Sequence, residues 1–184
     1  MKKLSFISQY IFKPRTVGAV LPSSKYLAAK MVQGIDFENA RCIVEYGAGT
    51  GVFTEKILQM RNKSTTVIVF EMNEAFIPML QERFGSHHNV HIFNESATNV
   101  RQRLSGCGFD KACYIVSGLP FASLPQNVSA NILEQTKAAL KPGGNFITFQ
   151  YTLLKMELFH KYFEDITTIR ELRNIPPAYV LRCK

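Results

Sequence analysis

The sequence predicts a single α/β domain with a mostly parallel sheet, and three observations support this prediction. From residue 41 onward, short apolar runs alternate with amphipathic segments, as repeated strand–helix–strand units require. Of the 184 residues, 46% are hydrophobic and 20% are charged, which is typical of a folded domain. No repeat, low-complexity stretch or Gly-, Ser- or Pro-rich linker divides the sequence, so we expect one domain over 1–184.

Apolar runs are expected to form buried strands at residues 42–46, 66–71, 90–93, 112–117 and 145–151. Helices are expected between them at 52–60, 73–84 and about 127–140, and Asn73 would cap the second of these. Alternation of this kind produces parallel strands joined by crossover helices.

Two further strand-like runs, 165–170 and 178–183, follow a helix expected at 155–163. They are close enough in sequence to pair as an antiparallel hairpin. The expected fold is therefore a seven-stranded, mostly parallel sheet with an antiparallel last strand and with helices on both faces.

The amino-terminal region, residues 1–34, is expected to form two helices ahead of a core over 35–184. Ser23 or Ser24 would cap the second helix and Gly34 would end it. The first helix is basic and amphipathic, so it suits the headgroup layer of an anionic membrane. Its apolar residues could equally pack over the domain, and the pattern leaves both interpretations open.

The formal net charge is +8, which favours a polyanionic partner, either nucleic acid or an anionic membrane surface. No run approaches the roughly 18 apolar residues of a membrane-spanning helix. The start of the chain also lacks the apolar core and cleavage site of a secretory signal. We expect a cytoplasmic protein, or one peripheral at the inner face of the membrane. No metal is expected, because the four cysteines form no C-x-x-C pair and no ligand-like group with histidine.

The most informative segment is the Gly-rich loop Gly47-Ala48-Gly49-Thr50-Gly51, which follows a predicted strand and opens a predicted helix. Glycines let the backbone turn sharply and pass close to a ligand. Glu71, at the end of the next strand, can accept both ribose hydroxyls of a nucleoside. The loop and the acid together predict a nucleoside site, with candidate residues Glu45, Tyr46, Gly47, Ala48, Gly49, Thr50, Gly51, Glu71 and Met72.

The pattern E-x-G-x-G-x-G, beginning at Glu45, resembles motif I of the class I S-adenosylmethionine-dependent methyltransferases. The dinucleotide fingerprint G-x-G-x-x-G differs from it, so S-adenosylmethionine is the expected cofactor. The resemblance implies a Rossmann-like fold in which Glu71 holds the ribose. It also implies an adenine contact after the third strand, at either Glu95 or Ser96.

The fourth strand ends in Ser117-Gly118-Leu119-Pro120-Phe121, where amino-group methyltransferases often carry an N/D/S-x-P-Y/F element. The ribosomal RNA adenine dimethyltransferases, which this chain resembles more distantly, have N-L-P-Y here. Gly118 replaces the asparagine, and this argues against base methylation. Ser117 is a candidate for cofactor contact as well, and the candidates on the acceptor side are Ser117, Leu119, Pro120, Phe121 and Tyr151. The aromatic rings of Tyr46, Phe121 and Tyr151 are expected either to surround the reacting amine or to lie in the core.

Four segments together resemble the bacterial phospholipid N-methyltransferase family: 16–24, 116–121, 149–151 and 174–178. The resemblance runs from about residue 11 to residue 180 and implies that phosphatidylethanolamine, or a methylated derivative of it, is the acceptor. Two alternatives stay open. One is an RNA adenine N6-methyltransferase, for which the charge is suitable but no further RNA-binding signature is present. The other is a domain that binds S-adenosylmethionine or a membrane without turnover.

Overall fold

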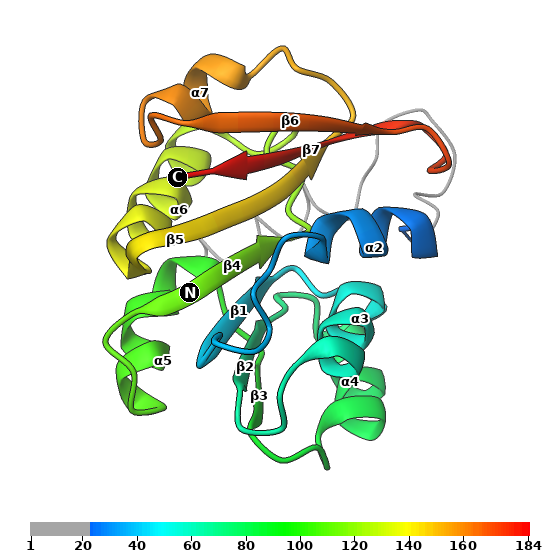
Figure 1. Ribbon diagram of the computed structural model, residues 1–184, viewed down its shortest axis with the longest axis vertical. Helices are drawn as coiled ribbons and strands as arrows, with labels where there is room; N and C mark the ends of the chain where they lie inside the picture. The colour runs from blue at the N-terminus through cyan, green and yellow to red at the C-terminus, as the bar shows by residue number, and fades with distance from the viewer. Residues whose placement is uncertain (1–22) are drawn as a thin grey trace.

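The structure is a computed structural model that describes residues 23–184. The expected first helix therefore lies outside the described residues. The described chain folds into one twisted sheet with helices packed against both of its faces (Figure 1).

The sheet has seven strands in the order β3-β2-β1-β4-β5-β7-β6. Strands β1 to β5 are parallel to one another, and β7 pairs antiparallel with both β5 and β6. The predicted mostly parallel sheet with an antiparallel last strand is therefore confirmed. The strand bounds are β1 Cys42–Tyr46, β2 Thr66–Phe70, β3 Val90–Phe93, β4 Ala112–Ser117, β5 Leu140–Gln150, β6 Ile166–Glu171 and β7 Ala178–Cys183.

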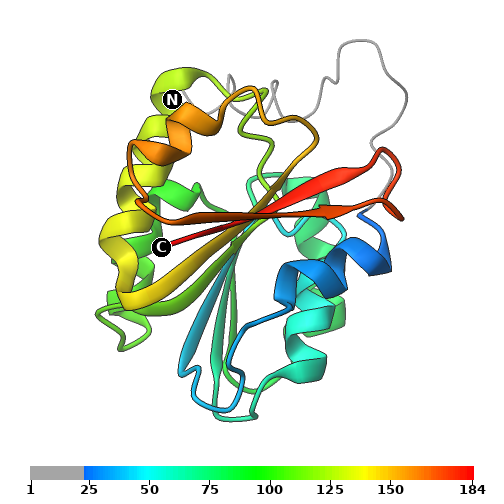
Figure 2. The same cartoon turned by 45° about the horizontal axis from the view of Figure 1, so that its top comes forward.

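Helices α2, α3 and α4 cover one face of the sheet, and α5, α6 and α7 cover the other, as the two views in Figures 1 and 2 show. Two short 3-10 turns, η1 and η2, lead into α4 and α5. The helix bounds are α2 Lys25–Val32, α3 Val52–Met60, α4 Ile77–Phe84, α5 Val100–Gly106, α6 Gln126–Ala139 and α7 Met156–His160, with η1 at Glu74–Phe76 and η2 at Ala97–Asn99.

Alternation along β1 explains how one strand serves two cores. Val44 and Tyr46 pack toward α5 and α6, whereas Ile43 packs toward α2 and α3. Glu45 has the same parity as Ile43, so its carboxyl group enters the α2–α4 side of the sheet. It is completely buried there, which places a charged group within an otherwise apolar layer.

Several local predictions can be compared with the structure. Ser24 caps α2 by accepting a hydrogen bond from the Leu27 amide, and Asn73 accepts one from the Ala75 amide at the start of η1. The last residue of helix α2 is Val32, and Gly34, with a φ of 84°, follows the C-cap Gln33 in the turn that ends the helix, as predicted. Its last turn closes through the Gln33 amide, which donates to the Ala29 carbonyl.

Several predicted bounds were wrong, including those of β2, β5 and α7. Strand β2 stops before Glu71, whose side chain turns back to the Gly-rich loop. Strand β5 begins at Leu140, several residues before the predicted start, because its pairing with β4 continues across an irregularity between Ala112 and Tyr114. Helix α7 is shorter than predicted, covering only Met156–His160.

Candidate functional site

The Gly-rich loop joins β1 to α3 and is fixed at both ends by backbone hydrogen bonds. The Gly47 amide donates to the Phe70 carbonyl at 2.7 Å, and the Gly51 amide donates to the Ala48 carbonyl at 2.8 Å. Gly47, Gly49 and Gly51 have φ angles of 67°, 53° and 81°. These left-handed conformations favour glycine, which explains why the loop needs three of them.

The three glycines differ in what surrounds them. A Cβ at Gly47 would lie 2.9 Å from the Leu119 side chain, and one at Gly51 would lie 2.5 Å from Phe84. At Gly49, nothing lies within 4 Å of the same position. Packing against the protein therefore explains the first and third glycines. Gly49 instead borders open space at the carboxyl edge of the sheet, where ligands bind in folds of this kind.

Glu71 is the acidic residue that the structure brings to this loop. Its buried carboxylate accepts hydrogen bonds from the Gly49 amide and the Asn73 amide, both at 2.7 Å. Two backbone donors fix the orientation of the carboxylate and leave lone pairs for further donors. Glu71 thus links the loop after β1 to the segment after β2, where Met72 follows it.

Glu45 lies below the loop and has no hydrogen-bond partner among residues 23–184 for either carboxyl oxygen. Burial raises the pKa of Glu45 to about 7; neighbouring Thr54 opposes the rise, and the charge of Glu71 adds to it. The Thr54 hydroxyl, on α3, is also buried without a geometric partner in the same part of the chain. A buried acid of this kind either stays protonated or is compensated by a nearby cation or hydrogen-bond donor.

The two candidates for the adenine contact lie after β3 and already have protein partners. Glu95 accepts hydrogen bonds from Arg103 and from the Asn99 amide group, and these contacts hold its pKa below the usual value. The Ser96 hydroxyl accepts a hydrogen bond from the Thr98 amide and so caps η2. The geometry leaves the choice between the two where the sequence left it.

The loop after β4 packs directly on the Gly-rich loop. The Gly118 amide donates to the Tyr46 carbonyl at 2.8 Å, and the buried Ser117 hydroxyl accepts from the Leu119 amide at 3.2 Å. A Cβ at Gly118 would lie 2.7 Å from the Gly47 carbonyl oxygen. The backbone approaches so closely that no side chain fits at position 118, whatever its polarity.

Two residues outside the predicted site hold this loop in place. The Lys155 ammonium donates to the carbonyls of Phe121 and Leu124, at 3.3 and 3.4 Å. The Gln150 side chain accepts from the Ala122 amide at 3.3 Å. Sequence reasoning missed both because they act across about thirty residues of chain, and no local pattern indicates such contacts.

Of the three candidate aromatic residues, two lie in the core. Tyr46 and Phe121 are completely buried; Tyr46 packs edge-on against Phe70, and Phe121 packs against Phe159. Only Tyr151 reaches the surface, at the end of β5. Partial burial raises the pKa of Tyr151, while hydrogen bonding with Asn174 opposes that shift.

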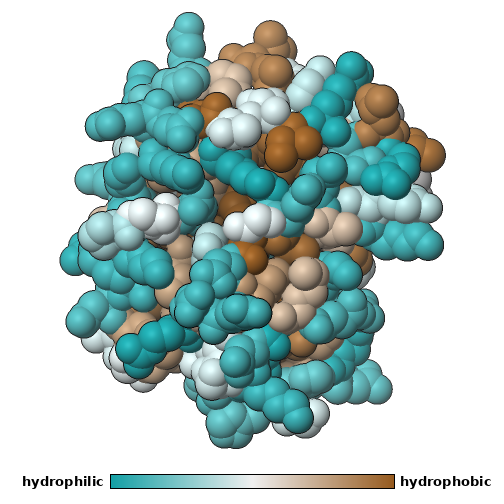
Figure 3. Space-filling model, in the orientation of Figure 1, coloured by the Kyte–Doolittle hydropathy of each residue, from teal (hydrophilic) through white to brown (hydrophobic). Residues whose placement is uncertain are grey.

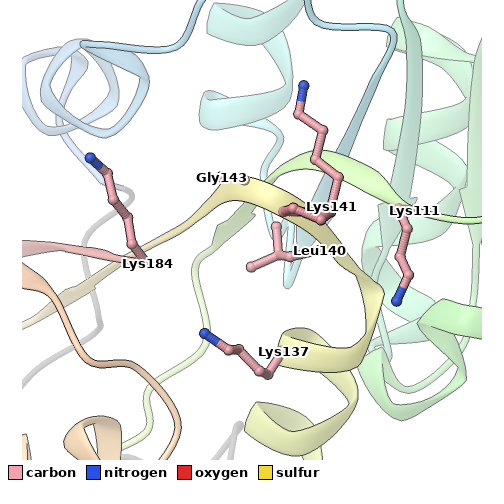
Figure 4. A pocket seen from close by; sticks show the side chains of 8 residues that line it. Lys111, Lys137, Leu140, Lys141, Gly143 and Lys184 are labelled. Atoms are coloured by element: carbon pink, nitrogen blue, oxygen red, sulfur yellow. The ribbon is translucent and has the colours of Figure 1, made fainter.

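Apolar side chains reach the surface in the upper part of Figure 3, over the β5–α7 loop and the β6–β7 turn. A cavity of about 310 Å³ lies at the opposite edge of the sheet, where β4 and β5 begin. Its lysines point apart in Figure 4: Lys111 donates to the Ala138 carbonyl, and Lys137 lies over the Phe163 ring at 5.3 Å. This cavity is far from the Gly-rich loop and does not form part of the site.

Two groups of candidate features are absent from residues 23–184. No group of three or more His, Cys, Asp and Glu side chains is arranged to hold a metal ion. No helix in this range is long and apolar enough to cross a membrane.

The architecture has close counterparts among solved structures. A precorrin-6y C5,15-methyltransferase from Geobacter metallireducens superposes with a TM-score of 0.69 at 11% identity, over 92% of each chain. An rRNA methylase from Streptococcus thermophilus superposes with a TM-score of 0.62 at 13% identity, over 90% of this chain and 99% of that one. At such low identity these likenesses show the fold. This fold, the Gly-rich loop and the methyltransferase family described next together define a class I S-adenosylmethionine-dependent methyltransferase, whose methyl donor is S-adenosylmethionine.

Sequence comparison identifies the family. A model described as ribosomal RNA adenine dimethylase matches residues 18–149, and the chain belongs to this family. An ornithine lipid N-methyltransferase from Singulisphaera acidiphila is 32% identical over 97% of this chain and 94% of its own length. A ribosomal RNA small subunit methyltransferase A from Thermotoga neapolitana is 30% identical, but over 55% of this chain and 38% of its own length.

The site residues fit S-adenosylmethionine in two respects. The open space at Gly49 has room for a ligand beside the Glu71 carboxylate. The unpartnered Glu45 carboxyl is buried in β1, two residues before the Gly-rich loop begins. S-adenosylmethionine carries a positively charged sulfonium group and an ammonium group. A site with two carboxyl groups, neither of them in a salt bridge with a basic side chain of residues 23–184, suits that charge.

Proposed function

We propose that this methyltransferase N-methylates the primary amine of a membrane lipid headgroup. Two acceptors follow from separate observations. The resemblance of the sequence to the phospholipid N-methyltransferases points to phosphatidylethanolamine, and the relative matched nearly end to end is named for an ornithine lipid. Both offer an amine at the surface of a bilayer, so the proposed substrate class is an amine-bearing polar lipid.

The extent of the match is the observation that carries this proposal. The match covers 97% of this chain and 94% of the ornithine lipid enzyme, so the likeness includes the acceptor side of the domain. The ribosomal RNA relative from Thermotoga neapolitana matches over only 38% of its own length. Shared cofactor machinery is enough to explain a match of that extent.

Gly118 supports the same choice. An adenine acceptor would be held by the amide of an asparagine at this position, as in N-L-P-Y. Here the position touches the Gly47 carbonyl so closely that a Cβ would lie 2.7 Å from its oxygen. Gly118→Asn should therefore displace the Gly-rich loop rather than create an adenine site.

Positioning is the main contribution the protein would make to catalysis. When bound, S-adenosylmethionine supplies an electrophilic methyl group on a positively charged sulfur. The Gly-rich loop and Glu71 would hold the donor, while the segment after β4, tied down by Lys155 and Gln150, would orient the amine. Fixing two reactants in this way can account for about 7–11 kcal/mol of a barrier.

The test offers one donor to three acceptors. Protein and methyl-labelled S-adenosylmethionine are incubated separately with detergent-dispersed phosphatidylethanolamine, with ornithine lipid and with total ribosomal RNA. We expect label in the extracted lipid of at least one lipid arm. Label in RNA, with none in either lipid, would overturn the proposal and favour adenine methylation.

Glu71→Ala provides the matched control for donor binding in this experiment. Removing the carboxylate should weaken the binding of S-adenosylmethionine by about 1–3 kcal/mol, because the buried ribose hydroxyls would lose a charged hydrogen-bond acceptor. Calorimetry measures this loss independently of any acceptor. An unchanged affinity in a folded variant would remove Glu71 from the donor site.

A further inference from the structure

An exposed apolar surface lies at the same edge of the sheet as the Gly-rich loop. Its members are Leu154, 91% exposed, after β5, and Leu172 and Ile175, 64% and 75% exposed, in the β6–β7 turn. Leu153 adds a fourth apolar side chain, 39% exposed. We call these four residues the apolar edge. Exposed apolar side chains that gather on one side of a protein mark an interaction site more often than scattered single residues do.

The sheet brings the two segments to one side of the molecule. Strand β7 runs antiparallel to β5, and Gln150 at the end of β5 pairs with Tyr179 near the start of β7. The β6–β7 turn therefore lies beside the loop that leaves β5, as Figures 1 and 2 both show. Because β1, β4 and β5 are parallel, the loop after β5 and the Gly-rich loop lie at the same edge of the sheet.

The β6–β7 turn is ordered by polar contacts beneath it. The Asn174 side chain, 2% exposed, accepts from the Ser24 amide at 3.0 Å and donates to the Pro176 carbonyl at 2.7 Å. The buried Glu171 carboxylate accepts from the Arg173 amide at 2.9 Å. Polar side chains thus point inward while Leu172 and Ile175 point outward. This reverses the usual arrangement of polar and apolar side chains, and it suits contact with a partner that has an apolar interior.

Cations flank the β6–β7 part of the apolar edge. Arg173 lies over the Tyr26 ring at 4.4 Å, with Lys25 on the same ring at 5.4 Å, and Arg170 lies over Tyr179 at 5.5 Å. All three cations are exposed. Glu171, the acid within the turn, is neutralised by its ion pair with Arg173. Apolar side chains flanked by cations are complementary to an anionic bilayer, which offers acyl chains below negative headgroups.

We propose that the apolar edge docks on an anionic phospholipid bilayer. Leu154, Leu172 and Ile175 would enter the interfacial layer while Arg170 and Arg173 lie among the headgroups. This orientation turns the carboxyl edge of the sheet toward the membrane, where a lipid amine is presented. The proposal rests on the proposed function for the reason to dock, but it assigns the surface to described residues of the core, independently of residues 1–22.

The absence of tryptophan from the sequence permits a direct test. Leu172→Trp introduces a single fluorescent reporter at the apolar edge, and Met60→Trp introduces one at the exposed end of α3, on the opposite edge. Each full-length variant is titrated with vesicles of phosphatidylcholine and phosphatidylglycerol. We expect a blue shift and quenching by brominated lipid for Leu172→Trp and neither for Met60→Trp.

A second variant measures the contribution of the surface to binding. Leu172→Ser combined with Ile175→Ser should reduce partitioning onto the same vesicles by about tenfold or more, because two apolar side chains no longer leave water. Met60→Ser should leave partitioning unchanged, and calorimetry should find the same donor affinity in all three proteins. Residues 1–22 are intact in each, so their contribution to binding is constant.

The outcomes separate this proposal from the proposed function. An unshifted Leu172→Trp emission on saturating vesicles, or unchanged partitioning of the double variant, would overturn the docking surface. So would a blue shift that follows protein concentration without vesicles, since that indicates contact between copies of the chain. Failure of the wild-type protein to methylate detergent-dispersed lipid would instead overturn the proposed function, because detergent removes the need to dock.

Discussion

Glu45, on β1, and Glu71, just after β2, show how two nearby acidic residues come to have different environments. Glu71 is held by two backbone amides, whereas Glu45 is buried with no hydrogen-bond partner among the described residues. The pKa of Glu45 is raised to about 7, chiefly by burial. Without bound S-adenosylmethionine, ionisation of the buried Glu45 carboxyl is therefore electrostatically unfavourable, and a nearby bound cation would reduce that cost.

The pH dependence of stability should report that cost. Because the folded pKa of Glu45 exceeds its ordinary value of 4.5, the folded state binds more protons, and stability falls as pH rises from about 4.5 to about 7. Each pKa unit is worth about 1.4 kcal/mol, so the loss is on the order of 3 kcal/mol. Glu45→Gln should escape it. Urea unfolding in the absence of S-adenosylmethionine should show the free energy of unfolding of the variant rising relative to that of wild type as the pH goes from about 4.5 to about 7. A difference that does not depend on pH would contradict the assignment.

Gly49 permits a matched comparison at the same scale. Gly49 and Gly143 have φ angles of 53° and 73°, and neither has a heavy atom within 4 Å of a built Cβ. Alanine at either position should cost roughly 1–2 kcal/mol of stability through backbone strain. Only Gly49→Ala should also lower the affinity for S-adenosylmethionine, by about tenfold or more, because of the two glycines only Gly49 borders the donor site. Calorimetry on both variants decides, and equal donor affinities would place the donor elsewhere.

At the scale of elements, the sequence predicted well where one apolar run makes one strand. The bounds of β1, β3, β4 and β7 are those predicted, as are the bounds of α3. Helix α5 was not predicted, because its seven residues contribute only Val100 and Leu104 to the core. So weak a periodicity does not stand out from a polar loop. The helix against which α5 packs, α6, begins about twenty residues after α5 ends.

The site divides in the same way. The Gly-rich loop and Glu71 could be predicted because their spacing is local. The isolation of the Glu45 carboxyl and the contact of Gly118 with the Gly47 carbonyl could not be, because both depend on how β1, β4 and α3 pack. Tyr46 and Phe121 show that position in the sequence alone does not identify a site residue. Both lie at or after the end of a strand at the carboxyl edge of the sheet, yet both rings are buried in the core.

The β6–β7 turn and helix α2 form one structural unit through Asn174. Replacing the buried Asn174 with alanine removes the acceptor for the Ser24 amide and the donor to the Pro176 carbonyl. We expect a loss of about 1–3 kcal/mol in the free energy of unfolding, the usual cost of leaving buried groups unpaired. Asn39→Ala, at an exposed side chain bonded to Asp36, should change it by less than about 1 kcal/mol. Urea unfolding compares them, and equal losses would mean that Asn174 does not anchor the turn.

At the scale of the whole molecule, the sheet separates two edges with different chemistry. The carboxyl edge carries the Gly-rich loop, the segment after β4 and the apolar edge, whereas the amino edge carries the lysine-lined cavity. The formal charge of +8 is therefore not confined to the proposed docking surface. Long-range attraction would bring the protein to an anionic surface, and the apolar edge would determine which side faces it.

Salt should separate these two contributions. Raising NaCl from about 0.1 M to about 1 M shortens the screening length from about 10 Å to about 3 Å, so each cation near an anionic surface loses much of its roughly 1 kcal/mol. Methyl transfer to a lipid amine in anionic vesicles should then require at least about tenfold more lipid for half-maximal rate. With the same lipid in neutral detergent micelles the rate should hardly change, because no surface charge remains to be screened. Donor affinity, measured by calorimetry at both salt concentrations, should change little, since the Gly-rich loop and Glu71 bind at a short, partly buried distance. An equal loss of activity in the micelles would contradict surface attraction and locate the salt effect within the site.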